Sequence, residues 1–119
     1  MSENLTAFPI VDHAVIADLR EVIPEEFPDL VQTLLCDLPL QLADIYAAAA
    51  WGDADALYRT AHKLKSGSGS MGALRLSELA RQLEARGHSD NLLDIAPLLE
   101  QIRLTVEQTQ VSFQALLAT

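Results

Sequence analysis

The chain has little of several features that would assign it to a common protein class. It contains a single cysteine, Cys36, so no disulfide can form within it, and we expect a reducing, cytoplasmic setting. Leucines surround Cys36 in the sequence, which predicts a small buried side chain there. Aromatic residues make up only 5% of a chain that is 50% apolar. That composition is typical of a helical bundle rich in Leu and Ala.

Positive charge is also scarce. The chain has 8 Lys and Arg residues against 17 Asp and Glu residues, which gives a net charge of −9. Binding to nucleic acid requires clusters of cations, so we expect no nucleic-acid partner. No apolar run approaches the ~20 residues of a transmembrane helix and no secretory signal opens the chain, so we expect no membrane contact. The length of 119 residues suits a single domain, 1–119, which we expect to be monomeric.

Helical periodicity is the main signal that the sequence does contain. Apolar residues recur every three or four positions, and no segment alternates as a strand would. Asp12 and Asp53 are placed to cap helices, whereas Gly52 and Gly87 are placed to end them. Residues 1–10 are predicted to form a tail. The sequence therefore predicts an all-α fold, an antiparallel four-helix bundle with a short extra N-terminal helix. The expected helices span about residues 12–22, 25–51, 53–71, 73–87 and 92–117.

The segment 61–73 stands out from this apolar pattern. It reads A-H-K-L-K-S-G-S-G-S-M-G-A and adds a histidine, a lysine and a run of small residues. In a helix, Ala61 and Leu64 belong to the buried seam, whereas His62 lies off it. Lys65 follows His62 by one helical turn. The pattern predicts a solvent-facing imidazole that a large partner could reach.

The residues after Lys65 have low helix propensity, although the buried seam of the helix continues through them. Residues 66–70 are serines and glycines, which are poor helix formers, glycine costing about 1 kcal/mol each against alanine. The seam nevertheless continues through Ser68 and Met71, and small residues allow a neighbouring helix to approach closely. We therefore predict that the helix continues and that a tight turn follows near Gly72.

Three interpretations of His62 compete on the residues alone. A neutral imidazole is nucleophilic near pH 7, so His62 could accept a phosphoryl group whose oxygens the Lys65 ammonium would hold. A second interpretation, a phosphate-binding loop in S-G-S-G-S-M-G, fails because the G-x-x-x-x-G-K-[ST] spacing is absent and no strand precedes it. The third is an ordinary surface histidine, and spacing alone favours it.

Residues 61–84 resemble the signature of histidine-containing phosphotransfer (HPt) domains, the relay modules of multistep two-component signalling. The family pattern is approximately A-H-x-L-K-G-x-S-x-x-(apolar)-G-A-x-x-L-x-x-L-x-x-x-L-E. One position differs, since Ser66 stands where the family usually has glycine, and glycine is displaced to Gly67. The matching residues are Ala61, His62, Leu64, Lys65, Ser68, Met71, Gly72, Ala73, Leu76, Leu79, Leu83 and Glu84.

The resemblance implies a phosphorelay carrier. His62 would take a phosphoryl group from the aspartate of one response-regulator receiver domain and pass it to another receiver domain, and a hybrid sensor kinase could be a further partner. Lys65 would stabilise the phosphoryl group. Small residues would leave room beside the imidazole and allow close helix packing, and these are Ser66, Gly67, Ser68 and Gly69.

We expect no enzyme activity of the chain's own, because it has no nucleotide-binding motif. We also expect no cofactor and no metal site, because the histidines are scattered and no carboxylates cluster as ligands. The receiver domain would supply Mg²⁺. The alternative function is a helical interaction or adaptor module whose histidine is idle, and Ser66 keeps that alternative open.

Glu84 is a candidate for orienting the imidazole. It lies on the helix predicted to return antiparallel to the helix of His62, so a tight turn would bring it beside that histidine. Some HPt domains that resemble this chain have a Glu or Gln here that hydrogen-bonds the imidazole. A carboxylate that accepts the Nδ1 proton would fix the tautomer and leave Nε2 free to attack. The other interpretation is an ordinary solvated glutamate near a helix end.

Overall fold

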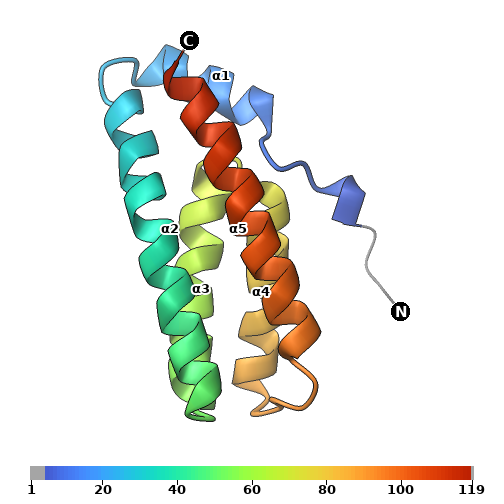
Figure 1. Cartoon of the computed structure of the whole chain (residues 1–119). Helices are drawn as coiled ribbons and strands as arrows, with labels where there is room; N and C mark the ends of the chain where they lie inside the picture. The colour runs from blue at the N-terminus through green and yellow to red at the C-terminus, as the bar shows by residue number, and fades with distance from the viewer. Residues whose placement is uncertain (1–4, 119) are drawn as a thin grey trace.

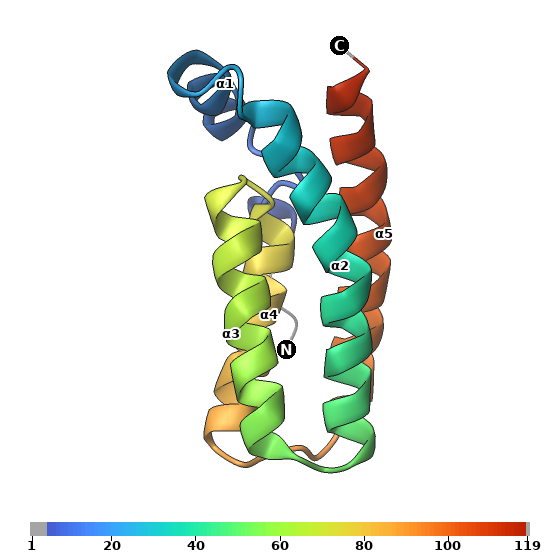
Figure 2. The same ribbon diagram turned by 90° about the vertical axis from the view of Figure 1, so that its left-hand side faces the viewer.

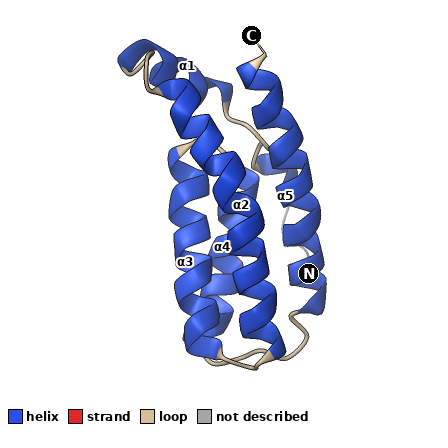
Figure 3. Cartoon of the chain, turned by 60° about the vertical axis from the view of Figure 1, so that its left-hand side comes forward, coloured by secondary structure: helices blue, strands red, loops and turns tan. Residues whose placement is uncertain are grey.

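The computed structural model describes residues 5–118, and in that range it consists of helices joined by loops, with no strand (Figure 1 and Figure 3). This confirms the predicted all-α class. Between residues 5 and 118, no helix is both long and apolar enough to cross a lipid bilayer. The elements are the 3-10 turn η1 (Leu5–Ala7) and the α-helices α1 (His13–Val22), α2 (Phe27–Ala50), α3 (Ala54–Ser70), α4 (Leu74–His88) and α5 (Ala96–Leu117).

Helices α2 to α5 form an antiparallel bundle, and α1 lies across one end of it (Figure 1). Figure 2 shows the α3–α4 pair on one side of the bundle and the α2–α5 pair on the other. The α1 helix lies where α2 begins and α5 ends, and Arg20 of α1 donates a hydrogen bond of 3.0 Å to the Leu116 carbonyl of α5. The predicted four-helix bundle with a short extra N-terminal helix is therefore confirmed.

The core follows the predicted apolar seams. Burying a leucine side chain contributes about 1.5–3 kcal/mol, so these seams decide which face of each helix points inward. Because His62 lies off the seam of α3, it stays outside the core. On α3 and α4, the side chains that are at most 1% exposed include Leu57, Leu64, Leu76, Leu79 and Leu83.

Cys36 is exposed, so the prediction that it is buried was wrong. The buried positions of α2 nearest to it are Leu34 and Leu38. Cys36 is two residues from each of them, roughly 200° around the helix axis. Its side chain therefore lies on the outer face of α2 although its neighbours in sequence are apolar.

The helix ends agree with the sequence at the caps and differ elsewhere. Asp12 and Asp53 cap α1 and α3 as predicted, each carboxylate accepting from a backbone amide at 3.0 Å. Helix α5 begins at Ala96 rather than near residue 92, because Pro97 occupies the first turn, where its missing N–H costs least. Gly87 does not end α4 but is buried within its last turn.

The N-terminal segment differs from the predicted tail. Arg75, at the start of α4, donates from Nε to the Phe8 carbonyl at 2.8 Å and from its backbone N–H to the Pro9 carbonyl at 2.9 Å. These bonds attach the segment before α1 to the bundle. Apolar periodicity does not reveal such an attachment, because it consists of hydrogen bonds to the backbone carbonyls of Phe8 and Pro9 rather than of an apolar stripe. Residues 1–4 of the predicted tail lie outside the described residues.

Candidate functional site

The helix that carries His62 continues through the serine and glycine run, as predicted, and ends at Ser70. Ser68 is buried, and its hydroxyl donates to the Leu64 carbonyl one turn earlier, a bond that satisfies a serine inside a helix. The chain then turns at Gly72, whose φ of 83° is a conformation that favours glycine. This tight turn returns α4 antiparallel along α3.

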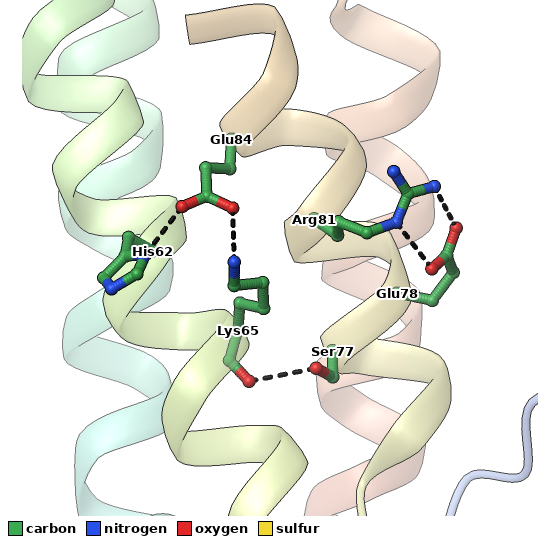
Figure 4. A network of polar contacts seen from close by, with 6 residues as sticks. All are labelled: His62, Lys65, Ser77, Glu78, Arg81 and Glu84. Carbon is green, nitrogen blue, oxygen red and sulfur yellow. Dashed lines mark hydrogen bonds and ion pairs between the residues drawn. The ribbon is translucent and has the colours of Figure 1, made fainter. Parts of the chain in front are cut away.

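The carboxylate of Glu84, on α4, bridges two side chains of α3 (Figure 4). Its Oε2 lies 2.6 Å from Nδ1 of His62, and its Oε1 accepts a bond of 2.7 Å from Nζ of Lys65. The His62 side chain is 54% exposed, whereas those of Lys65 and Glu84 are 33% and 13% exposed. The structure thus brings together the three residues that the sequence singled out, and the histidine is the most accessible of them.

The charge on Glu84 determines which nitrogen of His62 carries a proton. The hydrogen bond from Lys65 holds the pKa of the Glu84 carboxyl below its usual range, against the opposing effect of burial, and the bond with His62 lowers it further. Glu84 is therefore ionised at neutral pH and can only accept hydrogen bonds. The ring nitrogen that faces it, Nδ1, must then be the donor. In the neutral ring this leaves the lone pair on Nε2.

Tyr58, one turn before His62 on α3, covers one side of the imidazole. The two rings are stacked, with centroids 6.4 Å apart and planes 24° apart. Tyr58 also contacts the ring of His88, an exposed histidine, with centroids 5.6 Å apart. Figure 4 shows the other ring nitrogen of His62, Nε2, on the side of the ring away from Glu84.

The four small residues after Lys65 lie in different surroundings. Ser66 is exposed, and Gly67 has open space beside it, since a Cβ there would meet no atom within 4 Å. Ser68 is buried, and a Cβ on Gly69 would lie 3.1 Å from the Ser77 hydroxyl of α4. Whether Ser66 and Gly67 control access to His62 remains a prediction.

Sequence reasoning missed two residues that connect α3 and α4 here. The Ser77 hydroxyl donates to the Lys65 backbone carbonyl at 2.9 Å (Figure 4). Gly87 was expected to end α4, yet it lies against the backbone of α3. Ser77 and Gly87 are a polar and a small residue at helical spacing from Glu84, which places them on the face of α4 toward α3. That spacing was the signal that could have identified them. Within the part of the chain that the structure describes, no group of three or more His, Cys, Asp or Glu side chains could hold a metal ion.

Comparison with known proteins bears on the identity of this site. The profile of the Hpt domain family matches residues 29–112, which include His62, Lys65 and Glu84. The crystal structure of histidine-containing phosphotransfer protein B from Pseudomonas aeruginosa PAO1 is similar, with a TM-score of 0.89 and 34% identity. That match covers 92% of this chain and 96% of the other.

The HPt domain of a sensor hybrid histidine kinase from Shewanella shares the fold, with a TM-score of 0.77, 16% identity, and coverage of 92% of this chain and 94% of the other. No curated protein matches the sequence significantly. The family match spans most of the chain, and the Pseudomonas protein is related in sequence over nearly all of it. The chain therefore belongs to the Hpt domain family of histidine phosphotransfer carriers.

Proposed function

We propose that this protein carries a phosphoryl group on His62 between the aspartates of response-regulator receiver domains. The observation that supports this most directly is the half-exposed imidazole, whose Nδ1 faces the Glu84 carboxylate. Among residues 5–118, none forms a hydrogen bond with Nε2. The ring is thus oriented for attack by Nε2, and a receiver domain could reach that atom.

The proposed reaction needs no proton to enter or leave the ring. The Nε2 lone pair attacks the phosphorus of an aspartyl phosphate, the Nε2–P bond forms, and the P–O bond to the aspartate breaks with the carboxylate leaving. The ring then carries a positive charge, and its proton stays on Nδ1, hydrogen-bonded to Glu84, whose negative charge offsets that of the ring. In the second step the aspartate of another receiver attacks phosphorus, the N–P bond breaks, and the neutral imidazole returns.

Lys65 has a separate role in this proposal. It is paired with Glu84 in the unphosphorylated protein, one turn from His62. A phosphoryl group on Nε2 brings a second anion to the same place, and charge-assisted bonds to phosphoryl oxygens are strong. We therefore expect Lys65 to turn toward the phosphoryl group once it arrives. The receiver domain would contribute Mg²⁺ and the aspartate, and the chain would not phosphorylate itself.

Transfer from phosphorylated receiver domains tests the proposal. Each receiver of the source organism, phosphorylated in turn, is incubated with the wild-type chain and with His62→Gln. We expect acid-labile, alkali-stable label on the wild type from at least one receiver, and none on His62→Gln, with unchanged helical circular dichroism. An idle-histidine adaptor would bind a receiver and take no label. Label that persists in His62→Gln, on His13 or His88, would refute the assignment.

A further inference from the structure

Gly87 lies at a point where the backbones of α3 and α4 touch. It is buried in the last turn of α4. A Cβ at this position would lie 2.8 Å from the Tyr58 amide nitrogen and 2.9 Å from the Ala54 carbonyl oxygen. Both are backbone atoms of α3, so they cannot rotate aside as a side chain could. Only glycine lets α4 run this close to α3 at that level.

A second close approach lies farther along the same pair of helices. A Cβ on Gly69 of α3 would lie 3.1 Å from Oγ of Ser77 on α4. That hydroxyl donates to the Lys65 carbonyl at 2.9 Å, which ties the helices together at this level (Figure 4). Residues without side-chain bulk thus allow contact between α3 and α4 at two levels.

Glu84 lies between these two levels. Gly87 follows it by about one turn on α4, and Ser77 precedes it by about two turns. Its carboxylate must meet His62 at 2.6 Å and Lys65 at 2.7 Å at the same time. A glutamate side chain has a limited reach, and hydrogen bonds weaken beyond about 3.2 Å. Displacing α4 from α3 by the width of a methyl group would break at least one of these bonds.

We infer that Gly87 and Gly69 are positioning residues for the phosphoacceptor. They set the spacing between α3 and α4 at which Glu84 can hold Nδ1 of His62. Neither glycine touches His62 or the phosphoryl group, so both act through Glu84. The effect on phosphoryl uptake rests on the proposed function, whereas the effect on the His62 tautomer does not.

The test compares Gly87→Ala with Gly67→Ala. Gly67 is a matched control on α3, because a Cβ there would meet no atom within 4 Å. In unphosphorylated protein, ¹⁵N NMR of the His62 ring reports which nitrogen carries the proton. We expect the Nδ1–H tautomer in the wild type and in Gly67→Ala, and a mixture of both tautomers in Gly87→Ala.

The second readout is uptake from phosphoramidate, in which Nε2 bonds to phosphorus as ammonia leaves. Misplacing a reacting group by about 1 Å can cost up to about a hundredfold in rate. We expect a loss of up to about a hundredfold in Gly87→Ala and none in Gly52→Ala, a variant in the α2–α3 turn whose Cβ would meet no atom within 4 Å. Circular dichroism and thermal unfolding show whether each variant is folded.

If Gly87→Ala does not fold, Gly69→Ala takes its place, because its Cβ would meet a hydroxyl that can rotate rather than backbone. Adding Ser77→Gly to Gly69→Ala should then restore the Nδ1–H tautomer. A folded Gly87→Ala, or Gly69→Ala in its place, that keeps the wild-type tautomer would overturn the inference. If the tautomer shifts as expected but the wild type takes up no phosphoryl group from any donor, the proposed function fails and the positioning role stands.

Discussion

The Glu84 carboxylate contacts the side chains of both His62 and Lys65, so it determines the hydrogen bonding of both. One carboxylate oxygen faces His62, and the other accepts from Lys65. The Lys65 side chain is 33% exposed and ion-paired with Glu84. The charge of Lys65 therefore lies beside the imidazole in the unphosphorylated protein. Under the proposed function, Lys65 would leave Glu84 to bind the phosphoryl group.

Lys65→Ala should slow phosphoryl uptake and shorten the lifetime of the phosphohistidine, because the cation nearest the phosphoryl oxygens is lost. Lys63→Ala is the matched control, since Lys63 is an exposed cation of the same helix that no carboxylate contacts within residues 5–118. Uptake and decay are measured with phosphoramidate as donor. The unfolding free energy of Lys65→Ala should fall by about 1 kcal/mol or less, the usual range for such pairs. Equal rates in both variants would show that the charge of Lys65 is incidental.

Ser66→Gly should raise the transfer rate, because the serine side chain stands one turn after His62, where the family usually has glycine. The same change should lower the unfolding free energy by up to about 1 kcal/mol, the cost of glycine inside a helix. Ser66→Ala separates size from hydrogen bonding, since it removes only the hydroxyl. Receiver-dependent transfer rates decide the question, and a slower Ser66→Gly would mean that the hydroxyl assists the reaction.

At the scale of the helices, the sequence predicted the elements and the Glu84–His62 contact, but not how closely the backbones of α3 and α4 approach. Apolar periodicity placed every α-helix, and it carried α3 correctly past the serines and glycines. It also brought Glu84 to the level of His62, because a tight turn fixes the register of an antiparallel pair. It did not predict the close approach at Gly87, because the distance between two helix backbones depends on both surfaces at once. The burial of Cys36 was predicted wrongly for a different reason. The prediction used the apolar residues around Cys36 in the sequence and not its position around the helix axis.

The turn between α3 and α4 gives a prediction at this scale. Gly72 has a φ of 83°, and a Cβ on it would lie 3.0 Å from Cβ of Val15. Gly72→Ala should lose about 1–2 kcal/mol to the left-handed conformation, and more to crowding against α1. Gly52→Ala is the control, because its φ is 65° and a Cβ there would meet nothing within 4 Å. Urea unfolding should show the larger loss for Gly72→Ala, and equal losses would mean that α1 yields without cost.

Across the whole molecule, the candidate site occupies one hairpin of the bundle. His62, Lys65 and Glu84 all lie on α3 and α4, with α2 and α5 behind them (Figure 4). Helices α2 and α5 supply core side chains such as Leu38 and Phe113. Helices α2 and α5 thus pack behind the α3–α4 pair, and His62 lies on the exposed side of that pair.

The unfolding free energy of the protein should depend on pH in part because of Glu84. Its pKa is lowered in the folded protein, chiefly by the bond from Lys65, so the ionised carboxylate favours the folded state. That contribution is present at neutral pH and is lost as the pH falls from about 4.3, the ordinary glutamate value, through the lower pKa of the folded state. Glu84→Gln should therefore be less stable than wild type at pH 7, and the difference should shrink toward pH 3. A difference in unfolding free energy that is constant with pH would contradict the ion pair.

We propose that Glu84 holds Nδ1 of His62 so that Nε2 receives the phosphoryl group. The most direct measurement is ¹⁵N and ³¹P NMR of the phosphorylated, ¹⁵N-histidine-labelled chain, in which coupling across the N–P bond identifies the nitrogen that carries phosphorus. We predict one phosphoryl group per chain, on Nε2 of His62, with the proton retained on Nδ1. Phosphorus on Nδ1 of His62, or on a ring nitrogen of His13 or His88, would contradict the account.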